Sequence, residues 1–186
     1  MTRPIGLQPD DLARTMARFG VAEQQVRRDH VISHILAALS DDHRDELIFF
    51  GGTALSRTHL IDERLSEDID LIATGGRNDI ATALIDDIGA ALARTHGRIV
   101  WSPAWSSNSD VEPAVAVTTD GIAIKIQLLN ASRYEPWPTE VREIEQRYQD
   151  VPPTVLRVPT LGSLRRGRPP HGSIATPRAT CTTYGR

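Results

Sequence analysis

The sequence has little lysine, cysteine or aromatic residue. Lys125 is the single lysine among 21 basic residues, and aromatic residues make up 5% of the chain. Cys181 is the single cysteine, which excludes a disulfide framework within the chain and favours a cytoplasmic protein. No apolar run is long enough to cross a membrane, and no charged-then-apolar segment opens the chain. We therefore expect neither a membrane protein nor a secretory signal.

What remains is the composition of a globular protein with an unusual tail. The 186 residues are 40% hydrophobic and 24% charged, which suits one domain with a sizeable core. The net charge of −3 conceals an asymmetry: residues 1–160 hold 16 basic and 24 acidic residues, whereas residues 161–186 hold five arginines and no acid. The last segment also holds three prolines and four glycines without apolar periodicity, so we expect it to be irregular.

Apolar periodicity predicts alternating helices and strands. Helices are expected at 22–39, 54–60, 79–95 and 139–149, with Thr53 capping the second and Pro152-Pro153 ending the last. Strands are expected at 47–50, 68–73 and 98–101, followed by a loop at 102–113. Segments 115–119 and 122–129 alternate around Asp120-Gly121, which predicts a hairpin. The order indicates an α+β domain with a small mixed sheet flanked by helices.

The same reading divides the chain into four parts. Residues 1–45 form an N-terminal helical segment and residues 46–130 form the core. Residues 131–160 begin a C-terminal helical region, and residues 161–186 form the irregular tail.

Two aspartates lie within the strand expected at 68–73. Residues two apart on a strand point to the same face, so Asp68 and Asp70 project together while Ile69 and Leu71 point into the core. Two carboxylates rarely lie side by side within a strand without a cation to offset their repulsion. Oxygen ligands on one face suit Mg²⁺ together with substrate phosphates. The sequence therefore predicts a magnesium site at Asp68 and Asp70.

A phosphate-binding turn is expected directly upstream. Gly51-Gly52 follows an apolar strand and precedes a helix, so backbone N–H groups and the helix dipole can receive an anion. Hydroxyl groups and guanidinium groups of nearby residues complete the predicted phosphate site: Thr53, Ser66, Arg57 and Arg64. A lone Gly-Gly or Asp-x-Asp is weak evidence, but the ordered strand–Gly-Gly–helix–strand frame is much more specific.

This segment resembles the signature of the AbiEii-type nucleotidyltransferases of the DNA polymerase β-like superfamily. The matching residues are Gly51, Gly52, Thr53, Ala54, Leu55, Arg64, Ser66, Asp68, Ile69 and Asp70. Upstream, Arg28-Asp29-His30 resembles the leading helix of that family. The resemblance covers residues 20–160 and implies a polymerase β-like fold and a nucleotidyltransferase toxin of a toxin–antitoxin system. It implies NTP as substrate, Mg²⁺, and an antitoxin as partner; in the MenT branch the acceptor is the 3′ end of tRNA.

The chain departs from this pattern in two places. Superfamily members usually carry a third carboxylate on a neighbouring central strand, where this chain has Gln127. The metal would then be bound by Asp68 and Asp70 alone. Lys125, on the same strand as Gln127, would contact the triphosphate. The family's C-terminal lysine and Arg-Asp-Leu-Tyr-Asp-Leu-like motif are also missing. Codons can be chosen for residues 178–185 that give this motif when read two bases later, so we hypothesise a frameshift near residues 160–163. Sequencing the locus tests this hypothesis.

Three further interpretations follow from these departures, from the composition and from the histidines. A chain that lacks part of the site could bind nucleotide or antitoxin without turnover, as a binding module of the same fold. An acidic structural protein fits the composition but leaves the Gly-Gly and Asp-x-Asp frame unexplained. His30 and His34 are four apart on a helix, as zinc ligands can be, but no third ligand has a fitting spacing.

Overall fold

The computed structural model describes residues 5–105, 109, 111–133 and 137–165. Its central sheet has five strands in the order β1-β2-β5-β4-β3. These are β1 (Leu47–Phe50), β2 (Asp68–Ala73), β5 (Ala123–Asn130), β4 (Ala114–Val117) and β3 (Val100–Trp101). Only the β2–β5 pair is parallel, and the other neighbours are antiparallel. The expected α+β class with a mixed sheet is confirmed.

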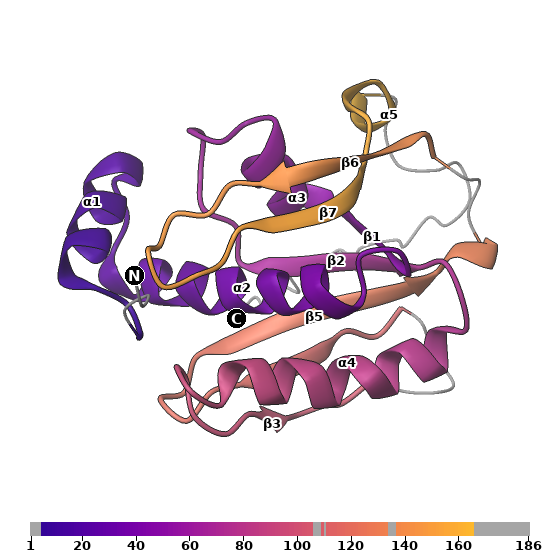
Figure 1. Ribbon diagram of the computed structural model, residues 1–186, viewed down its shortest axis with the longest axis horizontal. Helices are drawn as coiled ribbons and strands as arrows, with labels where there is room; N and C mark the ends of the chain where they lie inside the picture. The colour runs from indigo at the N-terminus through magenta and orange to yellow at the C-terminus, as the bar shows by residue number, and fades with distance from the viewer. Residues whose placement is uncertain (1–4, 106–108, 110, 134–136, 166–186) are drawn as a thin grey trace, which may run out of the picture.

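Two long helices cover one face of this sheet. Figure 1 shows α2 (Glu23–Asp42) and α4 (Arg77–Leu92) side by side across it. Apolar side chains from both helices and from one face of β2 and β5 form the core, including Ile35, Ile69, Leu84 and Ile126. Along α2, every residue from His30 to Leu39 is buried, because the sheet and α4 enclose this helix together with the segments that pack on its other side.

The remaining elements pack around one end of the sheet. α3 (Gly51–Thr58) connects β1 to β2, and α1 (Pro9–Phe19) packs on α2. A separate two-stranded sheet, β6 (Thr139–Ile144) with β7 (Thr154–Pro159), lies along β1 and between α2 and α3 in Figure 1. Short helices η1 (Ala131–Arg133) and α5 (Leu161–Arg165) complete the described chain.

Several predicted boundaries are confirmed closely. β1 and β2 have the expected limits, and Asp120-Gly121 joins β4 to β5 as an antiparallel hairpin, with Gly121 at φ +82°. The helix expected at 79–95 is α4, which begins two residues earlier and ends at Leu92. No helix among the described residues is long and apolar enough to span a membrane.

The helix predicted at 139–149 is wrong. These residues contain good helix formers, yet residues 139–144 form β6, which pairs with β7 from Thr139↔Pro159 to Ile144↔Thr154. Ile144 is buried with Leu156 and Val158 in the main core, while Val141 remains 51% exposed. Tertiary pairing of the two segments therefore overrides local helix propensity. The expected irregularity of the tail is wrong for residues 161–165, which form the short helix α5. Residues 166–186, which include the proposed frameshifted motif, lie outside the described residues.

Candidate active site

The four polar residues predicted on β2 and β5 lie on one face of the central sheet. The parallel register places Asp68 opposite Lys125 and Asp70 opposite Gln127. The residues between them, Ile69 and Ile126, are fully buried on the opposite face. Asp68 and Lys125 are exposed, and Asp70 and Gln127 are partly buried. Two carboxylates, an amine and an amide thus share a surface that a solute can reach.

The glycine turn lies directly against this carboxylate pair. Phe50, the last residue of β1, is opposite Asp70, so Gly51 follows at the edge of the carboxylate site. Gly51 has φ +78°, and a Cβ built on it would overlap Asp70 Oδ2 and lie 2.9 Å from Asp70 Cγ. Only glycine permits this left-handed backbone without a marked energetic cost and leaves room for the carboxylate. The site therefore requires glycine at this position for two separate reasons.

Arg64 and Ser66 approach the same turn from the segment before β2. A Cβ on Gly52 would lie 3.3 Å from Arg64 Nη2 and 3.3 Å from Ser66 Oγ. α3 begins at Gly51, and no side chain caps its N-terminus. Backbone N–H groups of a helix's first turn lack intrahelical partners, so this end of α3 can receive an anion beside the Arg64 guanidinium.

Thr53 does not cap α3 as predicted, because the helix begins at Gly51, three residues before the expected start, and its N-cap is Phe50. The Thr53 side chain is buried, and its hydroxyl donates a hydrogen bond to the backbone oxygen of Asp68. This bond joins α3 to the start of β2. Thr53 thus positions the two halves of the site relative to each other.

The prediction that Arg57 binds phosphate is not supported, because this side chain is fully buried in an ion pair. Arg57 Nη2 donates to Asp29 Oδ1 at 2.7 Å and to the Asp29 backbone oxygen at 3.1 Å. Its Nη1 donates to the backbone oxygen of Glu145 at 3.1 Å. Burial lowers the pKa of the Arg57 guanidinium, and the Asp29 carboxylate opposes this effect. Arg57 therefore connects α3 to α2 and to the residue that follows β6.

Two more residues complete this buried network, and the sequence pattern did not indicate either. Arg147 Nη1 donates to Asp29 Oδ1 at 3.1 Å, and Tyr148 Oη donates to Asp29 Oδ2 at 2.8 Å. Burial, followed by the negative charge of Asp29, raises the pKa of Tyr148 far above its usual range. The network lies behind α3, whose N-terminus carries the glycine turn.

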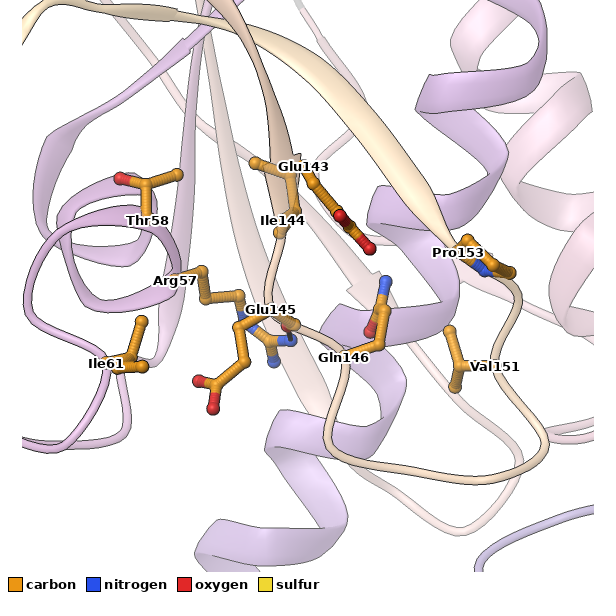
Figure 2. Close-up of a pocket in the computed structure, with 9 residues that line it drawn as sticks. All are labelled: Arg57, Thr58, Ile61, Glu143, Ile144, Glu145, Gln146, Val151 and Pro153. Carbon is orange, nitrogen blue, oxygen red and sulfur yellow. Dashed lines mark hydrogen bonds between the residues drawn. The ribbon is translucent and has the colours of Figure 1, made fainter.

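A pocket of about 520 Å³ lies between α3 and the β6–β7 hairpin. Figure 2 shows the residues that line it. Its lining includes Arg57, Glu143, Glu145 and Gln146, but not Asp68 or Asp70. Two glutamates beside an arginine that is already paired with Asp29 make this wall unsuitable for a triphosphate. The carboxylate face of β2 and β5 remains the better candidate active site.

Gln127 occupies the position opposite Asp70 where the superfamily pattern led us to seek a third carboxylate. Its Nε2 donates to the backbone oxygen of Val111 at 3.1 Å, which holds the segment before β4 against β5. Trp105 acts similarly, since its Nε1 donates to the Ile126 backbone oxygen at 3.0 Å. The amide thus has a structural contact that a carboxylate could not make.

Comparison with known families agrees with the geometry. A family model described as "Nucleotidyl transferase AbiEii toxin, Type IV TA system" matches residues 34–164. The chain belongs to the AbiEii family. The match includes both halves of the candidate site, from the glycine turn to the strand with Lys125 and Gln127.

Solved structures support the same fold. The chain is similar to MenT4, a nucleotidyltransferase toxin from Mycobacterium tuberculosis H37Rv, with 20% identity and a TM-score of 0.62. The alignment covers 84% of this chain and 56% of the MenT4 chain, so this AbiEii chain spans little more than half the length of that relative. A search of curated proteins found no match.

Proposed function

We propose that this AbiEii chain transfers a nucleoside monophosphate from an NTP to an acceptor hydroxyl and releases pyrophosphate. The acceptor oxygen forms a bond to the α-phosphorus, the bond from that phosphorus to the β-phosphate oxygen breaks, and the hydroxyl proton is released to water. The observation that supports this reaction is the arrangement of Asp68, Asp70 and Lys125 on one sheet face beside the Gly51-Gly52 turn.

Each residue has a proposed role that follows from its position. Gly51, Gly52, Ser66 and Arg64 bind the triphosphate at the N-terminus of α3, where N–H groups and a guanidinium offset its charge. Lys125 adds a second positive charge opposite Asp68. Such positioning and charge stabilisation supply most of the catalysis in phosphoryl chemistry.

Asp68 and Asp70 fit a bound Mg²⁺ ion by their chemistry. Both offer carboxylate oxygens on one face, and the carboxyl group of Asp70 occupies space that only a glycine at position 51 leaves open. Oxygen ligands from one or two carboxylates together with substrate phosphates are the usual environment of Mg²⁺ in proteins. The ion, when bound, would supply Lewis-acid stabilisation of the phosphate charge.

The proposed acceptor is the 3′ end of tRNA, as resemblance to the MenT branch implies. A cognate antitoxin is the expected protein partner of a type IV toxin. Both proposed substrates, NTP and tRNA, would place the reaction in the cytoplasm.

Incorporation of labelled NTP into tRNA tests the assignment. Asp68→Asn and Asp70→Asn should each lower incorporation on the order of 100-fold, the scale of losing one electrostatic contact at a developing charge. Asp86→Asn, which changes an exposed carboxylate on α4, is the matched control and should retain full activity. Undiminished incorporation by both site variants would remove the assignment.

Gln127 favours a second candidate function, a module that binds nucleotide or antitoxin without turnover. An amide is a weaker ligand for Mg²⁺ than a carboxylate, and here it also holds Val111. Isothermal titration with NTP beside the turnover assay separates the two functions. Binding without product in the wild type, together with product formation by Gln127→Glu, would favour the module.

A further inference from the structure

Three histidines that are distant in sequence converge beside α2. His30 and His34 lie one turn apart on α2, and His96 follows α4. One ring nitrogen of each histidine lies within 4.8 Å of those of the other two. The ring centroids are 4.7 Å apart for His30–His34, 5.0 Å for His30–His96 and 5.5 Å for His34–His96. The fold therefore supplies the third residue that the spacing of the histidines did not reveal.

A buried carboxylate adjoins two of these rings. Asp150, in the connection between β6 and β7, has both oxygens within 3.1 Å of His30 Nε2. Its Oδ2 also lies 3.0 Å from His34 Nε2. Burial alone would raise the pKa of Asp150, but the hydrogen bonds from the two histidines outweigh it and hold the pKa well below its usual range. A buried carboxyl group thus lies within hydrogen-bond distance of two imidazoles.

His96 differs from the other two because its Nε2 is buried and has no hydrogen-bond partner among the described residues. Burial, and then the nearby His30 and His34 rings, lower the pKa of His96 to about 4. An orphaned buried nitrogen in a folded domain calls for an explanation.

We propose that His30, His34 and His96 bind a transition-metal ion, with Zn²⁺ as the ion to test, and that Asp150 offsets its charge. Neutral imidazoles suit zinc and its neighbours, whereas Mg²⁺ prefers oxygen ligands. A carboxylate that accepts a hydrogen bond from, or lies beside, metal-bound imidazoles is a common feature of such sites. Zn–N bonds of about 2.0–2.1 Å place tetrahedral ligand atoms about 3.3 Å apart. The three nitrogens lie within 4.8 Å of one another, so binding requires the side chains to approach one another by up to about 1.5 Å.

The position of this histidine cluster indicates a structural role. It joins α2, the turn after α4 and the β6–β7 connection, which are three segments far apart in sequence. Tyr148 links the cluster to the network behind α3, because its ring packs edge-to-face on His30 at 4.9 Å while its hydroxyl donates to Asp29. A metal ion here would hold the β6–β7 connection against the two helices that cover the sheet.

Zinc titration of tag-free, chelator-treated protein tests the proposal. The wild type should bind one Zn²⁺ per chain, show a rise in Tm with Zn²⁺, and give the visible bands of nitrogen-ligated Co²⁺ when cobalt replaces zinc. His96→Asn removes a ligand whose Nε2 makes no hydrogen bond among the described residues, so the variant should fold yet lose stoichiometric binding. Asp150→Asn should weaken zinc binding 10- to 100-fold.

Two matched variants separate this cluster from other metal-binding groups. His59→Asn changes a histidine outside the cluster, and Asp68→Asn/Asp70→Asn removes the proposed magnesium ligands. Both should bind Zn²⁺ as the wild type does. Absence of stoichiometric Zn²⁺ binding by the wild type would overturn the proposal, as would a folded His96→Asn that binds Zn²⁺ with unchanged affinity. Neither result depends on nucleotidyltransferase activity.

Discussion

Gly51→Ala tests the geometry of the candidate active site more directly than removal of a charged group, because it leaves every polar residue in place. Gly51 has φ +78°, a conformation that costs an L-residue roughly 1–2 kcal/mol. The added Cβ would also overlap Asp70 Oδ2 and lie 2.9 Å from its Cγ. To reach ordinary van der Waals contact the carboxylate must retreat by about 1 Å or more. A displacement of that size at a reacting centre can cost on the order of 100-fold in rate.

Gly121→Ala is the matched control for this experiment. Gly121 has φ +82°, so alanine there has the same backbone cost, but nothing lies within 4 Å of the added Cβ. Urea unfolding should show both variants destabilised by roughly 1–2 kcal/mol. Incorporation of labelled NTP should fall on the order of 100-fold in Gly51→Ala and stay unchanged in Gly121→Ala. Equal activity of the two variants would refute the argument that the close approach of Gly51 to Asp70 matters.

Two further predictions concern the buried network. Arg57→Met should reduce the free energy of unfolding in urea by about 3 kcal/mol. This value is at the low end for breaking a buried ion pair, because Arg147 still contacts Asp29 in the variant. A raised KM for NTP at unchanged stability would instead indicate that Arg57 binds phosphate. Tyr148→Phe should reduce the decrease in the free energy of unfolding that accompanies a rise to alkaline pH. Below about pH 10 the Tyr148 hydroxyl is protonated in both the folded and the unfolded chain. Above that pH the unfolded chain releases the proton, whereas the raised pKa keeps the hydroxyl protonated in the folded chain. The free energy of unfolding therefore falls as pH rises. An identical pH profile for the variant and the wild type, from unfolding between pH 8 and 11, would contradict this cause.

The central part of the fold could be predicted from the sequence because its signals are local. Leu47–Phe50 is an apolar run that ends at Gly51, and Asp120-Gly121 is a turn pair between alternating segments. Asp68 and Asp70 could be placed on one face for the same reason, because side chains two residues apart on a strand point to the same side. Pairing Asp70 with Gln127 needed only one further inference, that β2 and β5 are neighbours.

The β6–β7 hairpin and the role of Arg57 could not be predicted in this way. Residues 139–144 have a helix-forming composition, and only their pairing with residues 154–159, which in turn contact β1, favours a strand. Arg57 lies one turn from the glycines, which suggests phosphate binding, but its side chain is directed to Asp29 on α2. Both outcomes depend on partners 10 or more residues away in the sequence, which apolar periodicity does not identify.

The contacts of Arg57 also explain how the site is kept in place. The glycine turn at the start of α3 needs a fixed helix, since Gly51 must stay against Asp70 and Gly52 near Arg64. At its start, α3 is tied to β2 by the hydroxyl of Thr53. At its end, Arg57 is tied to α2 through Asp29 and to the residue after β6 through the Glu145 backbone. Because a buried ion pair is weak evidence for net stability but strongly restricts geometry, we interpret this pair as fixing the orientation of α3. Arg57, which local spacing assigns to the phosphate, thus supports the same site indirectly, by holding the helix whose first-turn N–H groups we propose as the phosphate-binding groups.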